Sequence, residues 1–372
     1  MVLSFKEPLV PFELIIWLSS VILTAAAVRL IRPFALHIGL VDIPAGRKTH
    51  SGNIPLIGGI AIYIAFSLSV LLFHADLNTI RGFILAGSLL ITIGVLDDHH
   101  EISVKVRFLF QILAGIIMTS MAGVVLYDLG LLLGTDTPVT LAIWAAPFSV
   151  IAVIGVINAL NMVDGIDGLA GSLALVTLIA IQLLALMNGT VHIEALIISG
   201  TIIGFLWFNL FSRDKIFLGD AGSMFLGFAL AWFLIEATQG EQRLIPPVVA
   251  LWLFAVPLID TVAIMIRRLL KGQSPFLPDR EHLHHLFLRA GFTPPQTLLI
   301  ISAIAILLAT FGSSAYYYGL PEWLLLITFL ALFGLYLLTI THAWVVLKTI
   351  RRLLHRSNPR PDNSSTPARR HD

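Results

Sequence analysis

The strongest constraint on this chain is a series of apolar segments, each long enough to cross a lipid bilayer. A transmembrane helix needs roughly 17–25 mostly apolar residues. About eleven segments meet this length, near residues 11–31, 56–74, 80–96, 106–127, 139–160, 168–187, 192–211, 221–237, 246–266, 296–317 and 322–347. In hydrocarbon the backbone must satisfy its own hydrogen bonds, which favours helices. The sequence therefore predicts an all-α, polytopic integral membrane protein with about eleven transmembrane helices.

Composition agrees with this class. Charged residues make up 12% of the chain, against roughly 25% in soluble domains. The chain has no cysteine, which excludes disulfides and thiolate metal sites.

The cations are distributed unevenly between the predicted loops. Of the 23 Lys and Arg residues, all but Lys6, Arg81 and Arg243 fall on one side. The positive-inside rule makes that side cytoplasmic, with the N-terminus outside and the C-terminus inside. We expect one transmembrane catalytic domain over residues 1–347, with a cytoplasmic insert at about 267–295. A basic tail over 348–372 is expected to be disordered.

The most informative polar stretch is N-A-L-N-M-V-D-G-I-D-G-L-A at residues 158–170, between two apolar segments. On a helix, Asn161, Asp164 and Asp167 would share one face. Ionised carboxylates are costly beside hydrocarbon, so acids in this position are functional candidates. The alternative is an ordinary polar loop between two membrane helices.

Four further polar stretches fall on the same predicted face: residues 46–52, 96–101, 217–223 and 278–285. The external loops contain nothing comparable. Five stretches at one membrane face indicate one composite site, with a secondary transporter as the alternative from another class. A non-catalytic scaffold would leave these clusters without a purpose. Asp260, inside an apolar segment, is interpreted first as a structural acid and second as a helper of the site.

Three acids outside the 158–170 stretch are candidates for chemistry. Asp97 and Asp98 are adjacent carboxylates, which suit a divalent metal or a general base; an exposed helix end is the alternative. Asp220 follows Gly219, which leaves the backbone open. A carboxylate-rich set without cysteine suits Mg²⁺ or Mn²⁺ with a phosphate substrate. Phe217 could stack on a base, although packing is the commoner use of a lone aromatic.

Histidines and cations form the last group. His282, His284 and His285 follow Arg280, and this set fits phosphate recognition better than zinc binding, because no obvious histidine-rich partner stretch for a zinc site is found elsewhere. Lys48 could bind phosphate or serve only as a topology signal. No Walker or G-x-G-x-x-G motif is present, so ATP hydrolysis and dinucleotide binding have no support.

Taken together, these motifs resemble the polyprenyl-phosphate N-acetylhexosamine 1-phosphate transferases, from about Gly39 to the last segment. Four motifs occur in the family's order: L-D-D-H-H-E, N-A-L-N-M-V-D-G-I-D-G-L, F-L-G-D-A-G-S and P-D-R-E-H-L-H-H-L. The last is similar to the branch that uses UDP-N-acetylglucosamine (UDP-GlcNAc). Glu101 departs from the family pattern, which has Asp, so Glu101 is left out of the expected site.

The resemblance implies transfer of GlcNAc-1-phosphate from UDP-GlcNAc to undecaprenyl phosphate, with Mg²⁺ or Mn²⁺, at the bacterial inner membrane. The product would be a starter lipid for O-antigen and enterobacterial common antigen. No nucleic-acid partner is expected, and a homodimer is left open.

A mechanistic hypothesis assigns roles to individual residues, and in it only the place of Phe217 beside uracil is implied by the resemblance. Asp220 would be the leading metal ligand, with Asp98 or Asp164 as helpers, and Asp97 the base. Asp164, Asp167 and Asn161 would order the nucleotide sugar. The remaining expected substrate-binding residues are Lys48, Phe217, Gly219, Arg280, His282, His284 and His285. Direct attack by the lipid phosphate is preferred to a double displacement with a covalent aspartyl intermediate.

Overall fold

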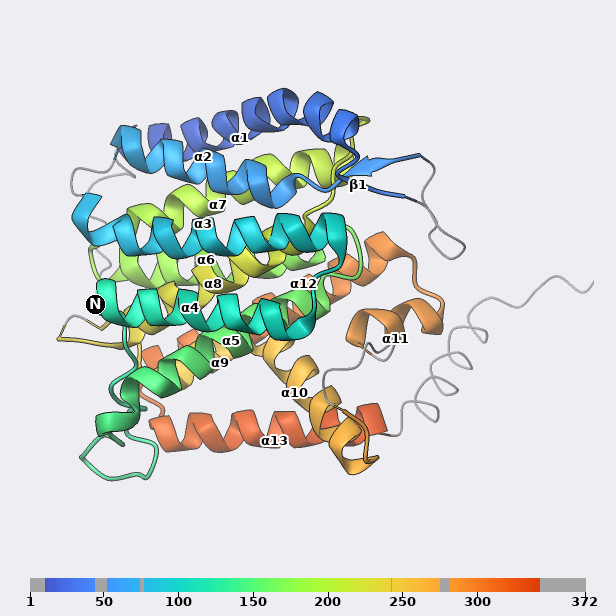
Figure 1. Cartoon of the computed structure of the whole chain (residues 1–372). Coiled ribbons are helices and arrows are strands. Elements are labelled where there is room, and N and C mark those ends of the chain that lie inside the picture. Colours follow the sequence, from blue (N-terminus) through green and yellow to red (C-terminus); the bar gives the residue numbers. More distant parts are fainter. Residues whose placement is uncertain (1–10, 44–51, 74–76, 242, 275–281, 342–372) are drawn as a thin grey trace, which may run out of the picture.

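The computed structural model describes residues 11–43, 52–73, 77–241, 243–274 and 282–341. Most of its helices run side by side in one bundle (Figure 1). The helices are α1 (Pro11–Ile38), α2 (Gly58–Phe73), α3 (Leu77–His100), α4 (Val104–Met121), α5 (Ala145–Val163), α6 (Leu169–Met187), α7 (Ile193–Leu206), α8 (Gly219–Thr238), α9 (Pro247–Leu253), α10 (Ala255–Leu270), α11 (Leu283–Ala290), α12 (Pro294–Tyr317) and α13 (Glu322–Thr341). The shorter elements are the 3₁₀ turn η1 (Ala142–Trp144), the π-helical turn η2 (Trp207–Phe211) and the antiparallel strands β1 (Val41–Asp42) and β2 (Ile54–Pro55).

The prediction of an all-α polytopic membrane protein is confirmed. Among the described residues, nine helices are long and apolar enough to cross a membrane, and α2 is a shorter apolar helix of 16 residues. Together with α9 and α10, which occupy the ninth predicted segment, these helices correspond to the eleven apolar segments. The predicted tail at 348–372 lies outside the described residues.

The ninth segment, 246–266, is not the single continuous helix that its hydropathy suggests. It is broken into α9 and α10, which meet at an angle of 87°. The proline at position 257 explains the break, because a proline ring clashes with the carbonyl four residues earlier, here that of Leu253. Helix α9 ends at Leu253, and Pro257 lies in the first turn of α10, where proline is tolerated.

Helix α8 lies at the centre of the bundle, and 94% of its apolar stretch is buried. A helix that is apolar on all sides requires neighbours on all sides. Aromatic rings of α2, α3 and α8 pack together here, including Phe66, Phe83 and Phe225.

At the start of α8, small residues allow the backbones of three helices to approach closely. A Cβ at Gly59 of α2 would overlap the backbone of Gly222, and a Cβ at Gly94 of α3 would overlap the Cα of Ala221. Glycine lets membrane helices approach in this way. The close packing holds the first turn of α8 against the ends of α2 and α3.

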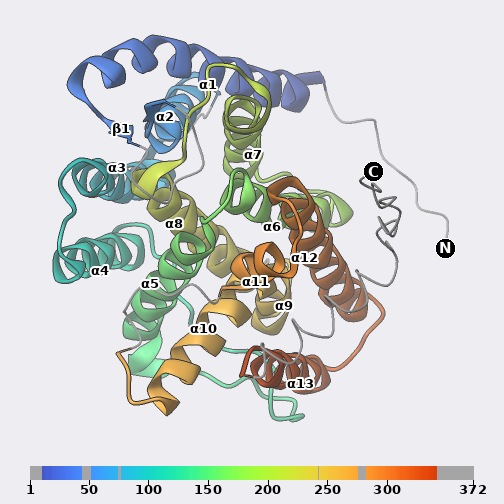
Figure 2. The ribbon, with the colours of Figure 1, turned by 90° about the vertical axis from the view of Figure 1, so that its right-hand side faces the viewer.

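The polar segments lie at one end of the bundle, on the right of Figure 1, where β1 and α11 are found. Figure 2 looks onto this end and shows α11 beside α12. This polar end of the bundle therefore contains the loop between α5 and α6, the start of α8 and the short helix α11.

The substitution Gly94→Ala should destabilise the protein by about 1–3 kcal/mol, because the added methyl group meets backbone atoms that cannot rotate away. Gly155→Ala in α5 is the matched control, because a Cβ there meets nothing within 4 Å. It should leave stability unchanged or raise it by up to about 1 kcal/mol. Thermal unfolding in detergent measures both; equal melting temperatures for the two variants would contradict the packing described here.

Candidate active site

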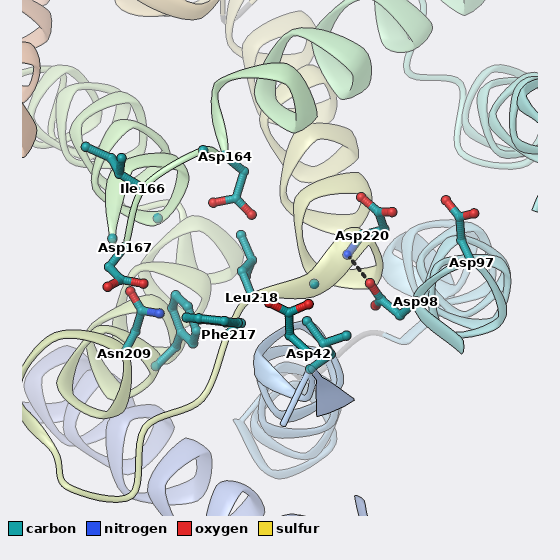
Figure 3. A pocket seen from close by; sticks show the side chains of 16 residues that line it. Asp42, Asp97, Asp98, Asp164, Ile166, Asp167, Asn209, Phe217, Leu218 and Asp220 are labelled. Atoms are coloured by element: carbon teal, nitrogen blue, oxygen red, sulfur yellow. Dashed lines mark hydrogen bonds between the residues drawn. The ribbon is translucent and has the colours of Figure 1, made fainter. Parts of the chain in front are cut away.

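A cavity of about 560 Å³ opens at the polar end of the bundle and is dominated by carboxylates (Figure 3). Six aspartates line it: Asp42, Asp97, Asp98, Asp164, Asp167 and Asp220. They come from β1, the end of α3, the loop after α5 and the first turn of α8. No Lys, Arg or His is among the described residues that line the cavity. The predicted gathering of separated acidic motifs at one place is therefore present in the structure.

Asp98 holds the start of α8. Its carboxylate accepts hydrogen bonds from the backbone N–H groups of Asp220 (2.8 Å) and Ala221 (3.3 Å). Helix α8 has no side-chain cap of its own, so a carboxylate from another helix performs this function. Gly219 is required here because its φ is +74° and a Cβ would contact Asp98. Asp98 thus positions Asp220, the expected metal ligand.

Asp97 points to a different set of partners. It is 6% exposed, and its Oδ1 accepts from the backbone N–H of Ile102 at 2.6 Å. Its Oδ2 pairs with Arg107 at 2.9 Å, and the same guanidinium group lies 3.9 Å from Asp220. Arg107 therefore partly neutralises the two acids on this side of the cavity.

Asn161 lies beneath the acids, where its side-chain N–H group donates to Asp220 and to Ser223, both at 2.7 Å. This joins the end of α5 to the start of α8. Asp164 follows where α5 ends, and its carboxylate has no hydrogen bond within the described residues. Burial, together with the charges of Asp220 and Asp167, raises the pKa of Asp164 to about 7.

The other side of the cavity contains Asp167, Asn209 and Phe217 (Figure 3). Asp167 pairs with Lys215 at 2.5 Å, and the Lys215 ammonium lies 5.4 Å from the centre of the Phe217 ring. The backbone of Phe217 hydrogen-bonds to Pro55 and Gly58, which fixes the ring at the cavity wall.

The histidines do not line the cavity, but they lie behind its wall. His282 contacts Asp260, and the ring of His285 lies 4.1 Å from that of His284. His284 is 2% exposed, and its Nε2 lies so close to Gly165 that no side chain would fit there. Burial, with a smaller effect from His285 and His282, lowers the pKa of His284 to about 3. His284 is therefore neutral near pH 7 and can act through hydrogen bonding rather than through charge.

Two of the expected residues, Lys48 and Arg280, lie outside the described residues. Glu101, which was left out of the expected site, does not line the cavity.

Sequence reasoning missed four residues that line or flank the cavity: Asp42, Arg107, Asn209 and Lys215. The lone Asn209 in the apolar run W-F-N-L-F was a usable signal. It lies on η2, is 4% exposed, and donates to the carbonyl of Ile216 at 2.8 Å. The two cations were counted only as topology signals, because nothing in the sequence pairs them with particular acids.

Comparison with known proteins identifies the family. The profile of glycosyl transferase family 4 matches residues 80–238, which include three of the acidic motifs. Proteins named undecaprenyl-phosphate alpha-N-acetylglucosaminyl 1-phosphate transferase are similar over most of the chain. The one from Yersinia pestis is 41% identical over 331 residues, covering 87% of this chain and 90% of that protein. The one from Haemophilus influenzae is 41% identical over 334 residues, covering 88% and 93%.

The chain belongs to glycosyl transferase family 4. The Salmonella typhimurium relative with the same name, 39% identical over 352 residues, covers 93% of this chain and 96% of its own length. The similarity therefore includes the segments beyond the family profile, among them the histidine motif.

The cavity of this family 4 protein suits a divalent cation of the kind on which such transferases depend. Among the described residues, no group of three His, Asp or Glu side chains forms a preformed metal-binding site. Mg²⁺ does not need one, because it is commonly bound through one or two carboxylates together with substrate phosphates and water. Asp220 with Asp98 or Asp164 would supply such carboxylates.

The raised pKa of Asp164 predicts a pH effect on stability. Between the usual carboxyl pKa of 3.8 and the value of about 7, the folded state binds more protons than the unfolded state. The free energy of unfolding should therefore fall as pH rises through this range. Asp164→Asn removes the free-energy cost of ionising this buried carboxyl. Without divalent cations, the melting temperature of the variant should therefore exceed that of the unsubstituted protein above pH 7. The difference should vanish near pH 4; a constant difference at all pH values would contradict this origin.

Proposed function

We propose that this protein transfers GlcNAc-1-phosphate from UDP-GlcNAc to undecaprenyl phosphate and releases UMP. The observation that carries the proposal is the cavity itself, which is lined by six carboxylates and, among the described residues, by no Lys, Arg or His. Arg107 and Lys215 pair with Asp97 and Asp167 from beside the cavity. Such a cavity would repel a diphosphate unless a cation entered with it. The names of the similar proteins supply the donor sugar and the acceptor lipid.

The chemistry requires two anions to meet. An oxygen of the lipid phosphate attacks the β-phosphorus of UDP-GlcNAc, a new P–O bond forms, and the bond to the α-phosphate oxygen breaks so that UMP leaves. A bound Mg²⁺ or Mn²⁺ would supply charge neutralisation and polarise the phosphoryl oxygens. Asp220, placed by Asp98 and Asn161, is the proposed leading ligand.

Two acids are candidates for the base that removes a proton from the lipid phosphate. Asp97 is the one that we infer from the motif, but both of its oxygens accept hydrogen bonds, one of them from Arg107. Asp164 has no such partner among the described residues, and its pKa of about 7 suits proton transfer at neutral pH. Comparing the pH–rate profiles of Asp97→Asn and Asp164→Asn separates the two assignments.

The opposite side of the cavity suits the nucleotide. Phe217 offers an aromatic face, and Lys215, paired with Asp167, brings a cation next to it. Asn209 adds an amide at the same wall. We assign uracil and ribose recognition to this side, and the reacting phosphates to the space between Asp164 and Asp220.

Direct attack is our preferred route, and the alternative is a double displacement through an aspartyl–phosphosugar. Incubation with UDP-GlcNAc in the absence of lipid phosphate, followed by mass spectrometry of the protein, distinguishes them. A stable adduct of one phosphosugar would overturn direct attack.

The proposed reaction is tested with labelled UDP-GlcNAc, undecaprenyl phosphate and Mg²⁺, followed by extraction of lipid-soluble label. Asp220→Asn should lower turnover by about 100-fold or more, because a carboxylate that neutralises the developing charge is lost. Asp136→Asn, in an exposed loop away from the cavity, is the control and should retain full activity. Competition with UDP-GalNAc and UDP-MurNAc-pentapeptide then identifies the donor. No lipid-soluble product from UDP-GlcNAc would contradict the proposal.

We further propose that the cavity faces the cytoplasm in the inner membrane of a bacterium, with the N-terminus outside. The cation distribution supports this orientation. Because the natural chain has no cysteine, a single cysteine reports on its own side. A cysteine at Asp136 should react with an impermeant maleimide added to intact cells, and a cysteine at Arg213 only after lysis. The reverse pattern would invert the proposed topology.

A further inference from the structure

Behind the cavity, three elements meet at one buried carboxylate that has no place in the reaction described above. Asp260 of α10 is 1% exposed. It accepts hydrogen bonds from the Tyr336 hydroxyl of α13 at 2.5 Å and from the backbone N–H of Leu283 at 3.0 Å, and its Oδ2 lies 2.8 Å from Nδ1 of His282. A buried carboxylate is costly unless it is well hydrogen-bonded, and here it has three partners.

We propose that Asp260 and Tyr336 are positioning residues, which hold α11 so that His284 supports the wall of the donor site. This inference rests on the proposed function, because it assigns a purpose to the histidine helix in donor binding.

The first argument concerns α11 itself. This helix has only eight residues and no side-chain cap of its own. Short helices are marginal in isolation, because the first turn costs more conformational entropy than its hydrogen bonds return. Asp260 substitutes for the missing cap by accepting from the first residue of the helix, and a negative charge there also interacts favourably with the helix dipole. The position of α11 therefore depends on a residue outside it.

The second argument concerns what α11 carries. His284 follows Leu283, whose backbone N–H donates to Asp260. Its Nε2 lies against Gly165 in the loop between Asp164 and Asp167. The rings of His282 and His284 are parallel, with centres 6.0 Å apart. A shift of α11 would therefore either press on this loop or withdraw its support, and the loop carries two of the cavity's six carboxylates.

The third argument concerns the proton on His282. Asp260 can only accept hydrogen bonds as a carboxylate, so its contact with Nδ1 requires the proton to be on Nδ1. This leaves Nε2 of His282 as the acceptor, or as a second donor when the ring is protonated. An asparagine at position 260 could instead donate its amide to Nδ1 and move the proton to Nε2.

Tyr336→Phe is the least disruptive test, because it removes one hydroxyl and keeps the ring. Losing one hydrogen bond to a charged group should raise the KM for UDP-GlcNAc by about fivefold or more. The value of kcat and the KM for undecaprenyl phosphate should stay within about twofold. Asp260→Asn should raise the donor KM further, because it also reverses the His282 tautomer.

Tyr63→Phe is the matched control. The Tyr63 hydroxyl also joins two helices, by donating to the carbonyl of Ile84 at 3.0 Å, but these are α2 and α3. Both Tyr→Phe variants should lower the melting temperature, and Tyr336→Phe by more, because its hydroxyl donates to a carboxylate rather than to a neutral carbonyl. Only Tyr336→Phe should change the donor KM, so a general loss of stability would not mimic the expected result.

Hydrogen–deuterium exchange of residues 286–290 provides a readout independent of turnover. These amides should exchange faster in Tyr336→Phe and Asp260→Asn than in the unsubstituted protein or in Tyr63→Phe. Faster exchange with an unchanged donor KM would mean that the contacts of Asp260 and Tyr336 are only structural, and it would overturn the proposal. Unchanged exchange would overturn it as well. Absence of GlcNAc-1-phosphate transfer by the unsubstituted protein would instead refute the proposed function, so the two failures are distinguishable.

Discussion

The contact on which the site depends is the one between the Asp98 carboxylate and the first backbone amides of α8. Helix α8 is surrounded by the bundle and lacks a cap of its own, so its free N–H groups need an acceptor from a neighbouring helix. Asp98 provides it from the last turn of α3. Gly94, one turn earlier on α3, allows the backbones to approach closely enough for this contact. Asp220 is consequently presented to the cavity at a fixed place.

The charges around the cavity are compensated at its two sides but not in its middle. Arg107 lies beside Asp97 and Asp220, and Lys215 lies beside Asp167. Asp164 lies between these pairs without a cation partner among the described residues. Burial, together with the charges of Asp220 and Asp167, raises its pKa to about 7. An uncompensated carboxylate is destabilised unless a proton or a metal ion joins it. Under the proposed function, the middle of the cavity is therefore where a divalent cation and its diphosphate would gain the most.

The membrane spans and the acidic motifs could be predicted because both are local properties of the sequence. Hydropathy marks each span, and the glycines beside Asp164, Asp167 and Asp220 mark places where the backbone turns sharply. The break between α9 and α10 was missed because hydropathy averages over it, although Pro257 determines where α9 must end. The ion pairs of Arg107 and Lys215 were also missed. Each joins residues that only the packing of separate helices brings together.

Asp260 shows why a buried acid in a membrane helix does not by itself indicate a transport path. Its oxygens face Tyr336, His282 and the start of α11, so its hydrogen-bonding capacity is used within the protein. A transported ion would require such an acid to exchange its partners. Asp164, whose carboxylate has no hydrogen bond within the described residues, lies instead in the cavity at one end of the bundle, as an enzyme acting at a membrane surface requires. The sequence interpretation of Asp260 as a structural acid agrees with this placement, and its contact with the histidine helix connects that structural task to the site.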